Sequence, residues 1–284
     1  MNSTTELAVV TGGTDGIGRE VALRLLQRGF RVIIVGRNPD KGQAATAWLQ
    51  AQHPDANVTY WQYDLALMQQ VRQLAERLKE AHVPLDVLVH CAGVMLRQRT
   101  LTEEGLETVF AVQYLARYLL THAVIDLLLQ SEAGRVVNVS AGGSINMALD
   151  FANLNGEKHY NGVTALKHES IANDMLMIDL QERTPQLRSY GYGPGYVLTD
   201  LLRDMPQMLR FFARTFGQLM AVTPQQAADE IIALLMDEAA SGLYGRLYTR
   251  RLKHHLPSGF RADAANRQRL REISEQWVTG FLNY

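Results

Sequence analysis

Cysteine is nearly absent from this sequence, since Cys91 is the only one among 284 residues. A single thiol cannot form a disulfide within the chain, and chains without disulfides are typical of reducing compartments. The first six residues, 1–6, also lack the basic and apolar regions that a signal peptide contains. These absences predict a cytoplasmic protein.

Neither sign of charge is in excess, because 28 Lys and Arg face 29 Asp and Glu, a formal net charge of −1. Such a balance gives no overall field that would attract nucleic acid or an anionic membrane. No uninterrupted apolar run approaches the roughly 18 residues that a membrane span needs, and no repeat or Gly/Ser linker divides the chain. We therefore expect one domain over 1–284 and a small apolar molecule as partner, while a homodimer stays open.

Glycine, by contrast, is concentrated near the start of the chain. An apolar stretch at 7–10 predicts a strand, 19–27 predicts a helix, and the sequence between them reads Thr11-Gly12-Gly13-Thr14-Asp15-Gly16-Ile17-Gly18. Glycine at 12, 16 and 18 lets the backbone turn tightly, approach a pyrophosphate and pack the helix on the strand. The free amides of the helix start then face the phosphates. A glycine turn without a ligand is the alternative, and the position between strand and helix favours the nucleotide.

The second predicted strand, 31–35, ends in Gly36-Arg37-Asn38 rather than in an acidic residue. An Asp or Glu at this point of a dinucleotide fold binds the ribose 2′-hydroxyl, whereas Arg suits a 2′-phosphate. The sequence therefore predicts NADP(H) in preference to NAD(H).

Strands and helices alternate along the rest of the chain. Further strands are expected at 58–63, 85–90, 135–139 and 189–193, and helices at 40–52, 68–82, 104–130, 164–182 and 223–236. This alternation predicts a single α/β domain with a doubly wound parallel sheet of the Rossmann type. The bulky apolar segment at about 203–222 is expected to form a substrate lid, with a core helix as an equal alternative and a membrane-surface helix as a weaker one. A C-terminal helix is expected over about 261–281.

Several short motifs together resemble the short-chain dehydrogenase/reductase family, and specifically its retinol-dehydrogenase-like branch. The resemblance covers nearly the whole chain and rests on 11–18, Gly36-Arg37-Asn38, Asp64-Leu65, Ala92-Gly93, 134–140, Tyr160-Asn161-Gly162 and 194–199. It implies a dinucleotide site with these cofactor-binding residues: Gly12, Thr14, Gly16, Ile17, Gly18, Arg37, Asn38, Asp64, Leu65, Ala92, Gly93, Pro194, Gly195, Val197 and Thr199.

The same resemblance implies that the family's catalytic residues are replaced. The family uses a Ser, a Tyr, a Lys four residues after the Tyr, and an Asn on the long helix; the corresponding positions here hold Ala141, Leu166, Ser170 and Gln113. No other Tyr has a Lys four residues later. Carbonyl reduction by hydride transfer needs a proton for the developing alkoxide, which the family tyrosine supplies and leucine cannot.

Three other residues are candidates for acid–base work. Glu169 lies within about 60° of Leu166 around a helix, although a solvated carboxylate is the simpler interpretation. His90 ends a strand at the edge where ligands bind in α/β folds, with a histidine packed beside the cofactor as the alternative. Tyr192 could donate a proton or only line the pocket, and the same holds for Tyr160 and Tyr196.

Two functions from different classes remain open on this sequence. The first is an enzyme with unorthodox chemistry, such as cyclisation, isomerisation, elimination or a reduction whose proton comes from substrate or water. The second is a non-catalytic, NADP(H)-responsive binding or regulatory protein, and an ordinary carbonyl or alcohol oxidoreductase is a residual third. No metal-ligand spacing is present, since His254-His255 has no carboxylate at useful spacing.

Overall fold

A single sheet of eight strands runs through the protein. The computed structural model describes residues 5–195, 222–236 and 246–281. Within them the strand order is β3-β2-β1-β4-β5-β6-β7-β8, and all neighbours are parallel except the antiparallel pair β7 and β8. The strands are β1 (Leu7–Thr11), β2 (Arg31–Gly36), β3 (Val58–Gln62), β4 (Val87–His90), β5 (Arg135–Val139), β6 (Arg188–Gly193), β7 (Arg246–Thr249) and β8 (Lys253–His255).

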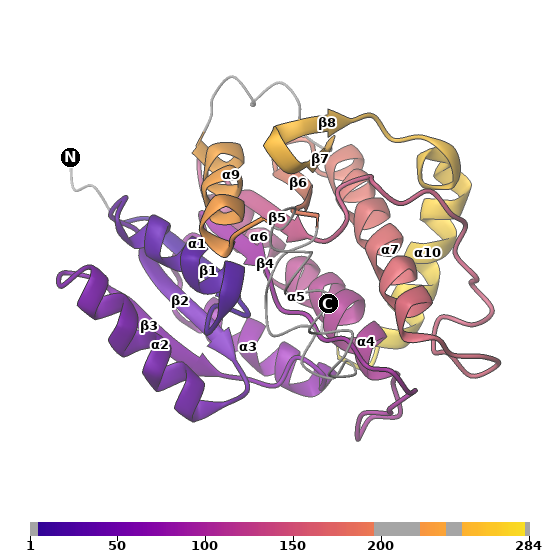
Figure 1. The fold of residues 1–284 in the computed structure, drawn as a ribbon, viewed down its shortest axis with the longest axis horizontal. Helices are drawn as coiled ribbons and strands as arrows, with labels where there is room; N and C mark the ends of the chain where they lie inside the picture. Colours follow the sequence, from indigo (N-terminus) through magenta and orange to yellow (C-terminus); the bar gives the residue numbers. More distant parts are fainter. Residues whose placement is uncertain (1–4, 196–221, 237–245, 282–284) are drawn as a thin grey trace.

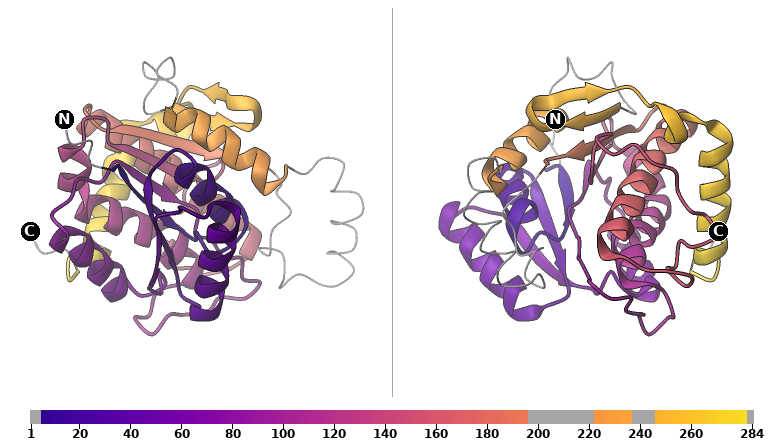
Figure 2. Two further views of the ribbon diagram at one scale, coloured as in Figure 1. Left: turned by 90° about the vertical axis from the view of Figure 1, so that its left-hand side faces the viewer. Right: turned by 45° about the vertical axis from the view of Figure 1, so that its right-hand side comes forward.

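Helices cover both faces of this sheet (Figures 1 and 2). One apolar core joins the sheet to α1 (Gly16–Leu26), α2 (Pro39–Gln52) and α9 (Pro224–Met236). The other core joins it to α3 (Met68–Glu80), α4 (Thr108–Phe110), the π-helix η1 (Ala111–Leu115), α5 (Ala116–Ala123), α6 (Ile125–Gln130) and α7 (Gly162–Arg183). The predicted doubly wound parallel sheet is confirmed, since alternate strand residues point to opposite faces and both faces are buried.

The prediction of one long helix over 104–130 is wrong in where the helix starts and in its continuity. The helical region begins at Thr108, where the Glu107 side chain caps it, and it changes from α to π geometry at Ala111–Leu115. It breaks again at Val124, whose φ and ψ of −109° and 13° are not helical. The strands β7 and β8 were not expected either. The lid predicted at about 203–222 lies outside the described residues except for Val222.

The C-terminal part of the chain packs on α7. The short 3₁₀-helices η5 (Arg250–Leu252) and η6 (Gly259–Ala262) precede α10 (Ala264–Val278). Helix α10 lies beside α7 on the side away from the sheet (Figure 2, right). Two ion pairs join the helices: Arg267 donates to both oxygens of Glu182 at 2.8 and 2.7 Å, and Arg271 to Asp179 at 2.6 Å.

A buried ion pair adds a third link between α7 and the C-terminal segment. Arg261 of η6 donates to Asp174 of α7 at 2.9 Å, and their side chains are only 4% and 0% exposed. The amide of Gly143, in the loop after β5, donates to the same carboxylate at 3.0 Å. Asp174 thus connects the loop beyond β5, the helix α7 and the end of the chain.

Candidate functional site

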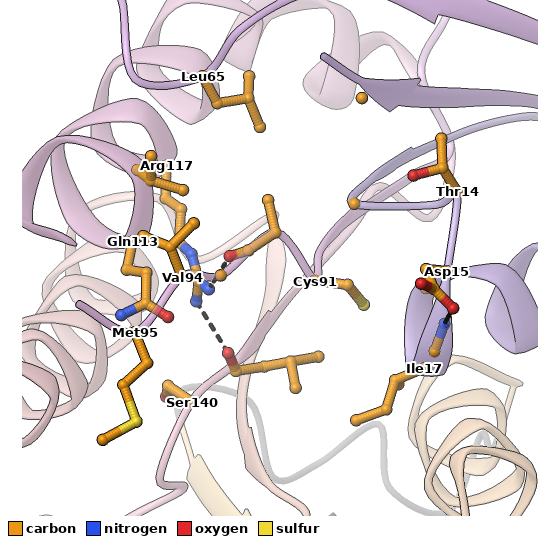
Figure 3. A pocket seen from close by; sticks show the side chains of 18 of the residues that line it. Thr14, Asp15, Ile17, Leu65, Cys91, Val94, Met95, Gln113, Arg117 and Ser140 are labelled. Carbon is orange, nitrogen blue, oxygen red and sulfur yellow. Dashed lines mark hydrogen bonds between the residues drawn. The ribbon is translucent and has the colours of Figure 1, made fainter. Parts of the chain in front are cut away.

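One cavity of about 580 Å³ opens at the carboxyl ends of the parallel strands. It runs from the glycine turn after β1 to the inner face of α7, and Figure 3 shows Thr14, Asp15 and Ile17 on one side with Gln113, Arg117 and Met95 on the other. This is the edge at which ligands bind in open α/β sheets.

The glycine turn is packed so tightly that side chains are excluded from it. Gly12 has a φ of +68°, and a Cβ there would lie 2.7 Å from the backbone of Ala92; a Cβ on Gly18 would lie 2.3 Å from the carbonyl oxygen of Gly12. The turn leads directly into α1, and Asp15 caps that helix by accepting from the Gly16 amide at 2.8 Å. The close approach and the helix N-terminus fit the pyrophosphate of a dinucleotide.

The outer end of the cavity carries exposed cations. Arg37 and Lys41 line it, and the Asn38 side chain accepts from the Lys41 amide at 2.9 Å to begin α2. Lys41 is paired with the Asp15 carboxylate at 3.0 Å. On the neighbouring loop Asp64 accepts from the Ala66 amide at 2.9 Å, and the loop brings Leu65 to the cavity. This end therefore fits the adenosine half of a dinucleotide.

Thirteen of the fifteen residues expected to hold the cofactor can be compared with this cavity, because Val197 and Thr199 lie outside the described residues. The structure brings all of the rest to the cavity wall: Gly12, Thr14, Gly16, Ile17, Gly18, Arg37, Asn38, Asp64, Leu65, Ala92, Gly93, Pro194 and Gly195.

The inner end of the cavity is organised by Asn173 of α7. Its Nδ2 donates to the backbone carbonyl of Gln113 in η1 at 2.7 Å and to that of Glu169 at 2.7 Å. Its Oδ1 accepts from Asn138 of β5 at 2.9 Å. The π turn at η1 directs the Gln113 carbonyl toward α7, and π turns of this kind are frequent at functional sites.

Arg117 lines the cavity, although the sequence analysis did not single it out. Its side chain is 4% exposed, and its two terminal nitrogens donate to the carbonyl oxygens of Ala92 at 2.7 Å and Val139 at 2.9 Å (Figure 3). Burial lowers the pKa of Arg117 to about 10, so the guanidinium stays cationic at neutral pH. The available signal was a single basic residue inside the apolar run 114–120.

Glu169 lies on the cavity wall beside Leu166 and Ser170. Its side chain is buried, and its Oε2 has no hydrogen-bond partner. Burial raises the pKa of the Glu169 carboxyl well above its ordinary value; the charge of Glu107 raises it further, and Arg117 opposes both. A raised pKa favours the protonated carboxyl, which is the form that can donate a proton.

His90 and Tyr192 are not among the described residues that line the cavity. The His90 Nε2 hydrogen-bonds the Thr121 hydroxyl at 2.9 Å, and burial lowers the pKa of this imidazole, which is neutral at neutral pH. Tyr192 packs in the core of the opposite sheet face and donates to Glu230 of α9 at 2.8 Å. Both side chains are thus engaged elsewhere.

Burial keeps both Tyr160, an acid–base candidate, and Cys91, which lines the cavity, in the protonated form. Tyr160 donates to the Leu96 carbonyl at 3.1 Å, and burial raises the pKa of its phenol. The Cys91 side chain lies in the cavity (Figure 3), but burial raises the pKa of its thiol to about 12 and keeps it protonated. No cluster of three metal-ligating side chains exists among the described residues. Tyr196 lies outside them.

The sheet order, the glycine turn and the cavity at the strand ends define a Rossmann-type protein. The short chain dehydrogenase family pattern matches residues 6–209, and the chain belongs to this family. Mouse retinol dehydrogenase 12 is 32% identical over 243 residues, covering 84% of this chain and 77% of its own length. Mouse polyprenol dehydrogenase is 30% identical over 272 residues, covering 93% and 81%.

Solved structures share the fold. A complex of Pseudomonas aeruginosa RhlG with NADP has a TM-score of 0.69 at 22% identity, over 91% of this chain and 97% of that one. An actinorhodin polyketide ketoreductase variant with NADPH has a TM-score of 0.65 at 21% identity, over 84% and 92%. None of the described helices combines the length and apolar character that crossing a bilayer requires.

Proposed function

We propose that this protein binds NADP(H) and uses Glu169 for proton transfer in unorthodox chemistry on a small apolar molecule. The cofactor part is supported by the glycine turn, by the Arg37 cation at the outer end and by the NADP complexes among the similar structures. When bound, NADPH supplies a hydride, or NADP accepts one. The Arg37 guanidinium would pair with the 2′-phosphate.

The observation that carries the catalytic part is the buried, unpartnered Glu169 carboxyl on the cavity wall. The position expected for the family tyrosine holds Leu166, which has no proton to give. Glu169 is in the helical turn that follows Leu166, and both residues line the same cavity. A protonated carboxyl there donates a proton to a developing negative charge, and an ionised one removes a proton from the substrate.

Ser170 favours a second candidate, a non-catalytic NADP(H)-responsive protein. Its hydroxyl donates to the Leu166 carbonyl of its own helix at 2.8 Å, so it does not replace the lysine that holds the nicotinamide ribose in the family. A protein of this kind would bind NADPH without consuming it and change its affinity for a partner. Ordinary carbonyl or alcohol oxidoreduction is the remaining candidate, which the names of the dehydrogenase relatives favour.

Glu169→Gln tests the proton-transfer role. The variant keeps the size of the side chain and removes its titration, so turnover of the substrate should fall by on the order of a hundredfold or more while NADPH affinity is unchanged. Glu132→Gln, which neutralises an exposed carboxylate elsewhere, serves as the control. Undiminished turnover in Glu169→Gln would show that Glu169 does not transfer a proton in the reaction.

Arg37→Asp tests the cofactor preference. We expect the unmodified protein to bind NADPH more tightly than NADH, and the variant to lose or reverse this preference, because the substitution places an anion beside the 2′-phosphate. Loss of a hydrogen-bonded charge contact corresponds to about 1.5–3 kcal/mol, or roughly ten- to a hundredfold in affinity for NADPH. Fluorescence titrations of both cofactors measure it, with Arg28→Asp, at an exposed position just beyond the C-terminus of α1, as control. Equal dissociation constants in the unmodified protein would refute the preference.

A further inference from the structure

An acidic residue, Asp15, lies inside the glycine turn that is to receive an anionic cofactor (Figure 3). Its Oδ1 accepts from the Gly16 amide at 2.8 Å, whereas an N-cap side chain usually accepts from the second or third amide of its helix. In the part of the chain that the structure describes, no side chain accepts from those amides, of Ile17 and Gly18. Asp15 therefore leaves most of the helix start to a pyrophosphate.

The second oxygen of Asp15 binds Lys41, the third residue of α2. The distance from the Lys41 Nζ to the Asp15 Oδ2 is 3.0 Å, and the two side chains are 45% and 50% exposed. Burial acts to raise the pKa of Asp15, but the hydrogen bonds from Lys41 and the Gly16 amide outweigh it and hold this pKa below its ordinary value. Asp15 is thus ionised at neutral pH, and both partners line the cavity.

This ion pair lies next to Arg37, the residue expected to bind the 2′-phosphate. A Cβ on Gly36 would lie 2.8 Å from the Thr14 side chain, so the end of β2 touches the glycine turn. The residues that follow this contact on its two sides are Asp15 and Arg37. Lys41 comes four residues after Arg37, so two cations and the Asp15 carboxylate share the outer end of the cavity.

We propose that Lys41 is a second cation for the 2′-phosphate and that Asp15 competes with the phosphate for it. An exposed ion pair contributes little free energy, whereas a phosphate offers more negative charge and three acceptor oxygens. The Lys41 ammonium therefore exchanges the carboxylate for the phosphate when NADPH binds. NADH has only a 2′-hydroxyl, and Lys41 then stays with Asp15. The inference rests on the NADP(H) part of the proposed function and adds what sets the cofactor preference.

Asp15→Asn should raise the affinity for NADPH by about three- to tenfold and that for NADH by less than about twofold. Asparagine is as good an N-cap as aspartate, so the variant keeps the start of α1 and removes only the charge. Lys41 then binds the phosphate without giving up the carboxylate. Isothermal titration measures the affinities, and a thermal melt verifies the fold.

Asp40→Asn is the matched control, because it neutralises an exposed carboxylate directly before Lys41 that is not among the described residues lining the cavity. Neither affinity should change by more than about twofold. A fall in NADPH affinity in Asp15→Asn would overturn the inference, since Asp15 would then position Lys41 for the phosphate rather than compete for it.

Lys41→Met should lower the affinity for NADPH by about tenfold, the lower end expected for one charged hydrogen bond, and leave that for NADH within about twofold. Lys79→Met, at an exposed position in the last turn of α3, is the control and should change neither. An equal loss for both cofactors would show that Lys41 acts on the pyrophosphate that they share, and the 2′-phosphate assignment would be wrong. This titration decides the assignment even if Asp15→Asn does not fold.

The double variant Asp15→Asn with Lys41→Met separates competition from simple repulsion. Without Lys41 the carboxylate has nothing to compete for, so adding Asp15→Asn to Lys41→Met should raise the NADPH affinity by less than about twofold. A gain as large as in the unmodified background would mean that Asp15 repels the phosphate directly, and the exchange of partners would be wrong. Adenosine 2′,5′-bisphosphate and AMP, which lack the nicotinamide, should repeat the pattern of NADPH and NADH.

The same titrations separate this inference from the proposed function. If the unmodified protein binds neither cofactor, the cofactor part of the proposed function fails. If NADPH is preferred through Arg37 while the Asp15 and Lys41 variants bind as their controls do, the proposed function stands and the role of the ion pair is wrong. No result here depends on Glu169, because binding and not turnover is measured.

Discussion

Arg261→Met is expected to lower the free energy of unfolding by about 3–5 kcal/mol, the usual cost of leaving a buried charge without its partner. The substitution puts an unbranched apolar side chain in place of the arginine and removes the guanidinium that pairs with Asp174 at 2.9 Å. For a domain of this size, 1 kcal/mol corresponds to roughly 2–4 °C in melting temperature. Urea denaturation followed by circular dichroism measures the loss.

The double variant Arg261→Met with Asp174→Asn should recover part of this stability, because no charge is then left buried. Burial already raises the pKa of Asp174 to about 7 against the opposing Arg261 charge, so the pKa in Arg261→Met should be higher still. The native carboxyl then binds a proton on acidification and the penalty falls, which predicts a smaller loss at pH 5.5 than at pH 8.

Arg72→Met, which breaks an exposed ion pair with Glu76, is the control and should cost less than about 1 kcal/mol. A loss in Arg261→Met no larger than this would show that the Asp174 charge is stabilised by other means.

Gly18→Ala is expected to weaken NADPH binding by on the order of a hundredfold, since the cofactor phosphates need the helix start in its present place. The new Cβ would lie 2.3 Å from the Gly12 carbonyl oxygen, so α1 must move away from the turn. Overpacking of this kind also costs about 1–3 kcal/mol of stability. Isothermal titration with NADPH and a thermal melt measure the two effects.

Gly280→Ala is the matched control, because a Cβ there meets nothing within 4 Å and the backbone φ is not positive. It should leave both the cofactor affinity and the melting temperature nearly unchanged. If Gly18→Ala binds NADPH as tightly as this control, the glycine turn does not hold the cofactor.

The main architecture was predictable because its signals are local. Apolar runs such as 31–35 alternate with helical periods, and these patterns give the parallel strands and their order of connection. The strands β7 and β8 escaped prediction since Arg246–Thr249 and Lys253–His255 are short and polar and are held by pairing with their neighbours. The π turn at Ala111–Leu115 likewise has a partner far along the chain, since Asn173 of α7 donates to its Gln113 carbonyl.

The candidate site was predictable where it consists of backbone and not where it consists of buried polar side chains. The glycine positions could be recognised from their spacing in the sequence. The contacts of Arg117, such as its hydrogen bond to the carbonyl of Ala92, depend on the folded arrangement and could not. The sequence places His90 and Tyr192 in strands that end at the ligand edge. It does not say that their side chains pack against Thr121 and Glu230.

The links between α7 and the C-terminal segment have a consequence for synthesis on the ribosome. Asp174 precedes Arg261 by 87 residues, and Tyr114 precedes its hydrogen-bond partner Ser274 by 160. At about 5–20 residues per second, about 4–17 s separate the translation of Asp174 from that of Arg261. The residues of the glycine turn are translated long before Arg261, so Asp174 has no buried cationic partner while the first half of the cavity wall already exists as chain. The ion pairs that tie α7 to the C-terminal segment can form only when that segment has been made.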